Sequence, residues 1–508
     1  MATSSPNAQQ VQALIQLLNN GHLAQAETLS KSLIATYPHV FILHHVLSLS
    51  LDGQQKYVEA VTSYQNALKL QANNADLWFN SAIALTHLNN LDEAASAYQQ
   101  AIRIKPNFFE AHGNFGTILQ RQGKLDEAIS SYQAGLKINP RDARGYFNLG
   151  TVLRDKGELQ AAVSAYQKAI QLFPNYTDAH NNLGETLRDQ GDMPAAVKSY
   201  QAALTLNPSH ANANYNMAEF LYLAKNYEEA IVYFERSQLD DWQARKLYCQ
   251  YKAFKFDAFK ANRDALAGGM PNTSPFVATL STHYSINTGT PDPYNFCKNG
   301  IDFVYQNKIL EANGELLNAL LNDINTADIA ERKQGRLTNG QQSAGNLFKR
   351  PEASFRALAD LIKQEFLRYK NKFSDAKCEL ILSFPTELEF TSSWYVKMQQ
   401  GGHLNAHIHE IGWISGAVYL AMPSQNGIEG AFEYGTHGDD YPILSPKTIA
   451  DFPAAHTMPK VGDIVLFPSS LFHRTIPFYS SPLFPNQERI CIAFDLKPTG
   501  VISQKNSY

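Results

Sequence analysis

The sequence lacks the features that mark secreted, membrane-spanning and disulfide-bonded chains. Its 508 residues include only four cysteines, Cys249, Cys297, Cys378 and Cys491, and no C-x-x-C pair, which excludes a disulfide framework and a cysteine-built zinc site. No run of about 18 apolar residues occurs, and no basic residue precedes Lys31, so the basic segment of a secretory signal is missing. We therefore expect a cytoplasmic protein without membrane attachment.

An excess of charge of one sign is also absent. The chain has 43 Lys and Arg against 47 Asp and Glu, a formal net charge of -4, and 44% hydrophobic residues. Nucleic-acid-binding domains carry a basic excess and disordered chains have few apolar residues, so neither class fits. At roughly 150 residues per domain the length allows about three domains. We expect a folded protein with no nucleic-acid partner.

The chain does contain a period of 34 residues that runs from near its start to about residue 244. The clearest copies begin at Ala75, Phe109, Ala143, Thr177 and Ala211. In each copy a small residue is followed four positions later by an aromatic one, as at Ala94 and Tyr98, and four copies close on Pro106, Pro140, Pro174 and Pro208. Because Pro stops a helix, each unit is predicted to be a pair of amphipathic helices.

This pattern resembles the tetratricopeptide repeat, in about seven copies, of which the first two, from Asn7 and Phe41, diverge most. The resemblance implies an α-helical superhelix whose concave surface is formed mainly by the first helix of each unit. Such a surface is a scaffold for binding a partner, but the fold alone does not identify that partner.

An amide recurs at the sixth position of five successive units. The five residues are Asn80, Asn114, Asn148, Asn182 and Asn216. Amides both donate and accept hydrogen bonds, as an extended peptide backbone requires. The array resembles the asparagine ladder of O-linked N-acetylglucosamine transferase, which implies capture of a protein or extended peptide. Alternatively, each amide satisfies a backbone group between repeats or meets solvent.

Beyond the repeats the pattern changes, and we predict three regions: repeats at 1–244, a helical extension and linker at 245–300, and a third domain at 301–508. Helices are expected around 308–323 and 352–372, and a loop at 335–346, because that stretch is rich in small polar residues. Short strands follow, in the order CELILSF, SSWYVKM, WISGAVYLAM, GDIVLFP and RICIAFDL. Such a series is typical of a β-sandwich or an open barrel.

Three histidines stand out in the strand region. His407 and His409 are two residues apart, so on a strand both rings would project from one face, and His473 follows the strand GDIVLFP. Imidazole is a common ligand of iron, zinc and copper. The small residues beside Arg489 on the last strand leave its planar guanidinium room to bind a carboxylate. Alternation places on that one face Arg489, Cys491, Ala493 and Asp495.

The stretches HIHEIGWISGAVYL, GDIVLFPSSLFHRTIP and ERICIAF resemble the double-stranded β-helix, or jelly-roll, of iron(II)- and 2-oxoglutarate-dependent oxygenases over roughly residues 300–498. By this resemblance His407 and His473 bind Fe(II), and Arg489 binds the distal carboxylate of the co-substrate 2-oxoglutarate. Position 409 usually carries Asp or Glu in these enzymes, whereas this chain has His409. Both a centre with all three histidines and one with two remain open.

The favoured hypothesis is a dioxygenase that uses Fe(II), 2-oxoglutarate and dioxygen to hydroxylate a protein or peptide held by the repeats. Two alternatives remain: an oxygenase of small molecules whose repeats recruit a partner, and a non-catalytic peptide-binding scaffold. Trp413 and Tyr419 share strand parity with the histidine pair and are candidates either for the pocket wall or for the core.

Overall fold

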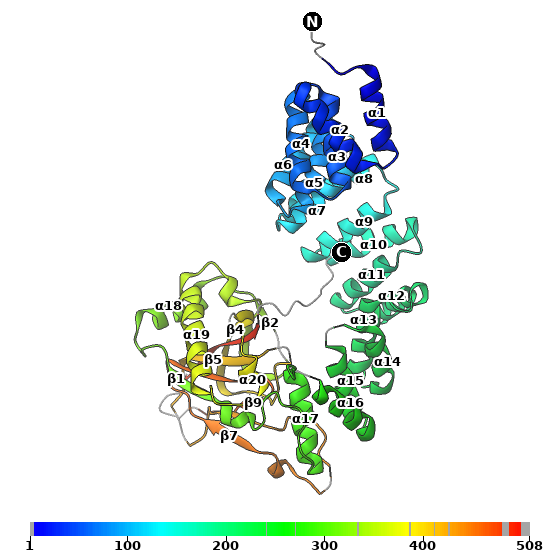
Figure 1. Ribbon diagram of the computed structural model, residues 1–508. Coiled ribbons are helices and arrows are strands. Elements are labelled where there is room, and N and C mark those ends of the chain that lie inside the picture. Colours follow the sequence, from blue (N-terminus) through cyan, green and yellow to red (C-terminus); the bar gives the residue numbers. More distant parts are fainter. Residues whose placement is uncertain are drawn as a thin grey trace. The chain divides into compact units, whose positions relative to one another are not determined.

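The computed structural model describes residues 5–239, 241–269, 271–332, 335–385, 388–410, 412–424, 427–444, 446–479 and 487–498. The chain forms two compact units, Met1–Phe220 and Leu221–Tyr508. The first is entirely helical where it is described, and the second combines helices with two β-sheets (Figure 1). The predicted boundaries after residues 244 and 300 stay a prediction.

Paired helices build the repeat region, as the 34-residue period predicts (Figure 1). Within the described residues they are α1 (Ala8–Asn19), α2 (Leu23–Thr36), α3 (Phe41–Gly53), α4 (Tyr57–Leu70), α5 (Ala75–His87), α6 (Leu91–Ile104), α7 (Phe109–Arg121), α8 (Leu125–Ile138), α9 (Ala143–Asp155), α10 (Leu159–Leu172), α11 (Thr177–Asp189), α12 (Met193–Leu206), α13 (Ala211–Leu223) and α14 (Tyr227–Ser237). The helices α5, α7, α9, α11 and α13 begin at the residues that open the predicted copies.

The prolines that close the repeats end helices and also accept hydrogen bonds. Pro106 and Pro174 each lie two residues beyond a helix, and their carbonyl oxygens contact the Nε2 atoms of His112 and His180, each at 3.0 Å. Since a carbonyl only accepts, these rings donate. Each turn is thereby fixed to the fourth residue of the next helix.

Glycine at the eighth position of three repeats makes room for the repeated tyrosine. A Cβ atom placed on Gly184 of α11 would lie 2.5 Å from Cε1 of Tyr200, which is fully buried. In contrast, a Cβ atom on Gly113 of α7 would meet nothing within 4 Å. The tyrosine that recurs in the sequence therefore packs directly against the first-helix backbone of its own repeat.

Substitution of these two glycines is expected to have opposite effects on stability. Gly184→Ala should lower the free energy of unfolding by about 1–3 kcal/mol, because the added methyl group forces Tyr200 from its place. Gly113→Ala should leave it unchanged or raise it by up to about 1 kcal/mol, since Ala is the better helix former. Urea unfolding followed by circular dichroism measures both, and equal midpoints would contradict the packing argument.

The second unit contains further helices and all the described strands. Its helices after α14 are α15 (Trp242–Lys252), α16 (Phe256–Gly268), α17 (Pro275–Thr288), α18 (Glu315–Thr326), α19 (Ala353–Lys372) and α20 (Glu379–Leu382), with 3₁₀ turns at Gly300–Phe303, Leu347–Lys349 and Ile449–Asp451. Its strands are β1 (Tyr305–Lys308), β2 (Glu331–Arg332), β3 (Leu337–Ser343), β4 (Leu388–Leu404), β5 (Ile414–Ala421), β6 (Phe432–Gly435), β7 (Ala454–Thr457), β8 (Asp463–Pro468), β9 (Phe472–Thr475) and β10 (Arg489–Pro498).

The described strands form two sheets, one of seven strands in the order β1-β8-β5-β10-β4-β3-β2 and one of three in the order β7-β6-β9. All the neighbouring strands run antiparallel, as in a jelly-roll. One face of the larger sheet carries Ile490, Ile492 and Phe494 into a core shared with α15–α17 and α19. The other face carries Val396 and Cys491 into a second core with Phe432 of the smaller sheet.

Several predicted elements differ in the structure. The helix expected around 308–323 is α18, which begins only at Glu315, and Tyr305–Lys308 form strand β1. The polar stretch at 335–346, predicted to be a loop, contains β3, which pairs with β4 through backbone hydrogen bonds although four of its seven residues are exposed. The segment CELILSF, predicted to be a strand, contains the short helix α20 instead. A short apolar run does not distinguish a buried strand from a buried helix. Also, none of the described helices is long and apolar enough to cross a membrane.

Candidate metal and co-substrate site

The three predicted histidines meet between the two sheets, but the H-x-H pair is not on a regular strand. His407 and His409 lie in the connection between β4 and β5, and His473 lies on β9. A single antiparallel bridge joins His407 to His473, with backbone N-to-O distances of 3.1 and 2.9 Å. The expectation of a strand at 407–409 was therefore wrong, because among these residues only His407 forms an antiparallel β-bridge.

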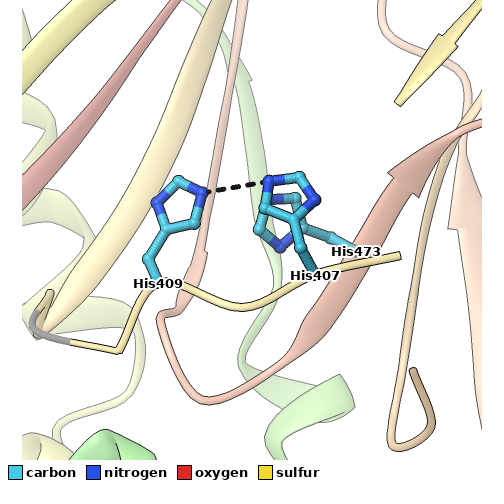
Figure 2. Close-up of side chains that lie close together, drawn as sticks. All are labelled: His407, His409 and His473. Atoms are coloured by element: carbon cyan, nitrogen blue, oxygen red, sulfur yellow. Dashed lines mark hydrogen bonds between the residues drawn. The ribbon is translucent and has the colours of Figure 1, made fainter. Parts of the chain in front are cut away.

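The imidazole rings converge on one point, as Figure 2 shows. One ligand atom from each ring can be chosen so that all three lie within 4.8 Å of one another, and the Nε2 atoms of His407 and His409 are 3.4 Å apart. Ring centroids are 4.3 Å apart for His407 and His473, and 4.8 Å apart for His409 and His473. This cluster is compact enough to hold one metal ion.

Hydrogen bonds at Nδ1 fix which nitrogen of each ring faces the cluster. His407 Nδ1 lies 2.8 Å from the carbonyl oxygen of Asn405, and His473 Nδ1 lies 3.3 Å from that of Leu471. His409 Nδ1 contacts the Asp495 carboxylate. Because all three partners are acceptors, each Nδ1 carries the proton, and each Nε2 keeps the lone pair that a metal requires.

Burial keeps the rings of His407 and His473 neutral. It lowers the pKa of His407 to about 3 and lowers the pKa of His473 well below its usual value, with the neighbouring histidines acting in the same direction. Only neutral imidazole binds a metal. At neutral pH these two rings are therefore in the ligating form without first losing protons.

Arg489 opens β10 on the same side of the sheet as the histidine cluster. Its side chain lines one pocket with His407, His409 and His473, and it is only 2% exposed. Its hydrogen-bonding contacts among the described residues are the sulfur atoms of Met398 and Cys491, each at 3.8 Å, and its Nε atom has no partner. A buried guanidinium without a carboxylate is unfavourable by itself, so this site suits an anion from outside the chain.

The two aromatic candidates lie on opposite faces of the larger sheet: Tyr419 is on β5, and Trp413 immediately precedes that strand. Tyr419 lines the pocket, fully buried, with its hydroxyl lacking a hydrogen-bond partner and its ring 5.0 Å from the Arg489 guanidinium carbon. Trp413 lies in the core on the other face and donates from Nε1 to the carbonyl of Leu380 at 3.1 Å. Tyr419 therefore offers a second polar group to a ligand of Arg489.

Asp495 is a site residue whose role the sequence did not reveal. It lies on the Arg489 face of β10, as alternation predicted, and its carboxylate also accepts hydrogen bonds from Ser415 at 2.7 Å and Ser392 at 2.8 Å. Burial alone would raise the pKa of Asp495, but His409 and the two hydroxyls lower it by more. The only sequence signal was shared parity with Arg489.

Glu410 does not compensate for the missing carboxylate ligand. It forms an ion pair with Arg245 of α15 at 2.8 Å, and the described ligand cluster contains histidines alone.

The five asparagines lie on the first helices of their repeats, as predicted, but their amides differ in availability. Asn80 and Asn148 are half-buried and have no hydrogen bond to another described residue. Asn114 lies near the Tyr98 hydroxyl and Asn182 near that of Tyr166. Asn182 Oδ1 also accepts from the Asn181 amide at 3.2 Å. Asn216 is 9% exposed, and its amide nitrogen lies 3.0 Å from oxygens of both Asn181 and Glu185. Asn216 therefore fits the alternative of an amide that satisfies groups between repeats.

Comparison with protein families matches both parts of the chain. Residues 392–495 match the model described as "Putative 2OG-Fe(II) oxygenase", where 2OG stands for 2-oxoglutarate. Residues 45–107, 114–177 and 181–244 match one tetratricopeptide repeat model, and residues 97–130 match another. The chain thus carries tetratricopeptide repeats followed by a domain of the 2OG-Fe(II) oxygenase type, a family that uses Fe(II) and 2-oxoglutarate.

Solved structures similar to this chain include several tetratricopeptide proteins. YrrB, described as having an unusual peptide-binding site, is 21% identical, with 36% of this chain and 95% of that chain covered and a TM-score of 0.34. MamA from Desulfovibrio magneticus is 23% identical, with coverage of 33% and 96% and a TM-score of 0.32. A repeat protein from Cytophaga hutchinsonii is 16% identical, with coverage of 45% and 93% and a TM-score of 0.40. None of the curated proteins matches the chain.

Proposed function

We propose that the protein is an Fe(II)- and 2-oxoglutarate-dependent hydroxylase of a protein or peptide held by its repeats. The observation that carries the proposal is the pairing, in one pocket, of three converging histidines with a buried Arg489 that has no carboxylate partner among the described residues. A metal that prefers imidazole and an anionic co-substrate account for both features.

In this proposal His407, His409 and His473 hold Fe(II) through their Nε2 atoms. Arg489 binds the distal carboxylate of 2-oxoglutarate, and the Tyr419 hydroxyl adds a hydrogen bond. The apolar wall around them excludes water from the reacting groups. When bound, iron, 2-oxoglutarate and dioxygen supply the oxidising chemistry: one oxygen atom enters a substrate C–H bond to give an alcohol, and the other ends in succinate as carbon dioxide leaves.

The repeats supply the case for a polypeptide substrate. Asn80 and Asn148 present free amides on first helices, which is the arrangement needed to bind the alternating N–H and C=O groups of an extended chain. Asn114 and Asn182 lie near tyrosine hydroxyls, and Asn182 accepts from Asn181, but both amides retain other donor and acceptor positions. We infer that backbone capture depends most on Asn80 and Asn148.

Enzymatic turnover tests the proposal directly. The full chain is incubated with Fe(II), 2-oxoglutarate and a library of peptides, and succinate and peptide mass are followed. We expect succinate to form with iron and a mass gain of one oxygen atom on particular peptides. Succinate without any peptide oxidation would favour a small-molecule substrate, and absence of succinate with iron bound would contradict the oxygenase itself.

Peptide affinity tests the role of the asparagines. The Asn80→Ala, Asn148→Ala double variant should bind the best library peptide roughly tenfold or more weakly, since each lost hydrogen bond contributes about 0.5–1.5 kcal/mol. Asn216→Ala is the matched comparison, and its loss should be smaller because that amide is already bonded within the repeats. Fluorescence anisotropy measures both, and unchanged binding of the double variant would remove the case for backbone capture.

A further inference from the structure

The ligand set proposed above carries less negative charge than the pocket requires. Fe(II) has two positive charges and the 2-oxoglutarate dianion two negative ones, so Arg489 leaves the loaded pocket one unit positive. The pocket wall in the described residues contains Arg474, which is paired with Glu433 at 2.6 Å, and Arg489, but no carboxylate that could balance Arg489. Because an uncompensated charge in a buried site is costly, the structure should supply a negative group nearby.

Asp495 lies where that group is needed, directly behind His409. Its Oδ1 atom contacts His409 Nδ1 and accepts from Ser415, and its Oδ2 atom accepts from Ser392 at 2.8 Å. The side chain is only 7% exposed. Ser415 in turn lies 2.7 Å from the Ser469 hydroxyl, so strand β4, strand β5 and the segment before His473 all help to hold the carboxylate.

We propose that Asp495 is a positioning residue that acts through His409: it fixes the ring with Nε2 toward the metal and supplies, from behind the ligand, the negative charge that a carboxylate ligand would otherwise bring. This inference rests on the proposed function, because it assumes that His409 binds the metal. A carboxylate that accepts from Nδ1–H makes the opposite nitrogen a stronger donor. His409 with Asp495 therefore replaces, as a pair, the single Asp or Glu expected at position 409.

Another buried acid, Glu365, lies away from the histidine cluster and serves as a comparison for Asp495. Glu365 of α19 is 2% exposed, but its carboxylate bonds Tyr305 at 2.9 Å and Arg368, on the helix-covered side of the larger sheet. Removing its charge should affect stability and not the metal. Glu365→Gln is thus a control that matches Asp495→Asn in chemistry and in burial.

Cobalt(II) binding to the full chain tests the inference without turnover. We expect the visible absorption of bound Co(II) to give an affinity roughly 10–100-fold weaker for Asp495→Asn than for the wild type, as for other residues behind metal ligands. Glu365→Gln should bind as the wild type does, and circular dichroism verifies the fold of both variants. A wild type that binds no Co(II) would defeat the proposed function, whereas equal binding by wild type and Asp495→Asn would overturn this inference alone.

A second background distinguishes charge supply from a general structural role. In His409→Asp the carboxylate stands at the ligand position itself, so Asp495 becomes a surplus negative charge. We expect Asp495→Asn in that background to leave Co(II) affinity unchanged or to raise it, so that the loss seen in the wild-type background disappears or reverses. A penalty of equal size in both backgrounds would show that Asp495 only supports the fold, which overturns the inference.

Discussion

Replacing His473 with alanine is expected to abolish specific metal binding while leaving the fold intact. The backbone hydrogen bonds between His407 and His473 do not involve the side chain, so the two segments remain joined. The variant loses a buried ring whose Nδ1 atom is already held by a carbonyl, leaving two ligands at most. Since even residues behind metal ligands change affinity 10–100-fold, we expect a loss of at least about 100-fold.

Anaerobic Fe(II) titration against a competing chelator measures this loss, and succinate formation should disappear with it. The matched control is His456→Ala, because His456 lies on β7 of the same small sheet but is exposed and outside the histidine cluster. His456→Ala should bind iron as the wild type does. Iron retained by His473→Ala would mean that the convergence of the three rings has no part in metal binding.

Replacing Arg489 with methionine should weaken the binding of 2-oxoglutarate without lowering the stability of the ligand-free protein. Arg489 is buried without a carboxylate partner among the described residues, so removing its charge relieves a desolvation cost, and Met fills similar apolar space. We expect the ligand-free variant to unfold at the same temperature as the wild type or higher. Its affinity for 2-oxoglutarate should fall at least roughly 100-fold, because two hydrogen bonds to charged groups contribute about 1.5–3 kcal/mol each.

Thermal unfolding with and without Mn(II) and 2-oxoglutarate measures both the stability of the ligand-free protein and the binding of 2-oxoglutarate. Ligand at about 100 times its Kd stabilises the wild type by about 2.7 kcal/mol, and Arg489→Met should lose this gain at the same concentration. Arg356→Met removes an exposed arginine of α19, and this variant should keep the stabilisation by ligand. A variant that is strongly destabilised without ligand would show that Arg489 serves the fold, contrary to this argument.

The repeat architecture could be predicted closely because its signal is redundant. The same spacing of small residue, aromatic and proline recurs in several units, and the structure begins helices at the residues that open the predicted copies. The faces of β10 could also be predicted, since Ile490, Ile492 and Phe494 enter one core and Cys491 enters the other. In both cases the periodicity of side chains carries the information.

The remaining features depend on contacts between distant segments. Strand β3 is polar and mostly exposed, and it is fixed by backbone pairing to β4, so no hydrophobic alternation marks it. The histidine pair lies in a connection whose course is set by its bridge to His473. Asp495 meets His409 across 86 positions of sequence. Shared parity along β10 indicated its face but not which side chain it would touch.

The alternation along β10 has a consequence for how relatives of this protein can diverge. One strand carries both Arg489 and Asp495, while the residues between them alternate between the two cores. Inserting or deleting one residue there would send every later side chain to the wrong face. Substitutions can accumulate on this strand, but changes of length cannot. The spacing of Arg489 and Asp495 should therefore tolerate less change than the identity of the residues between them.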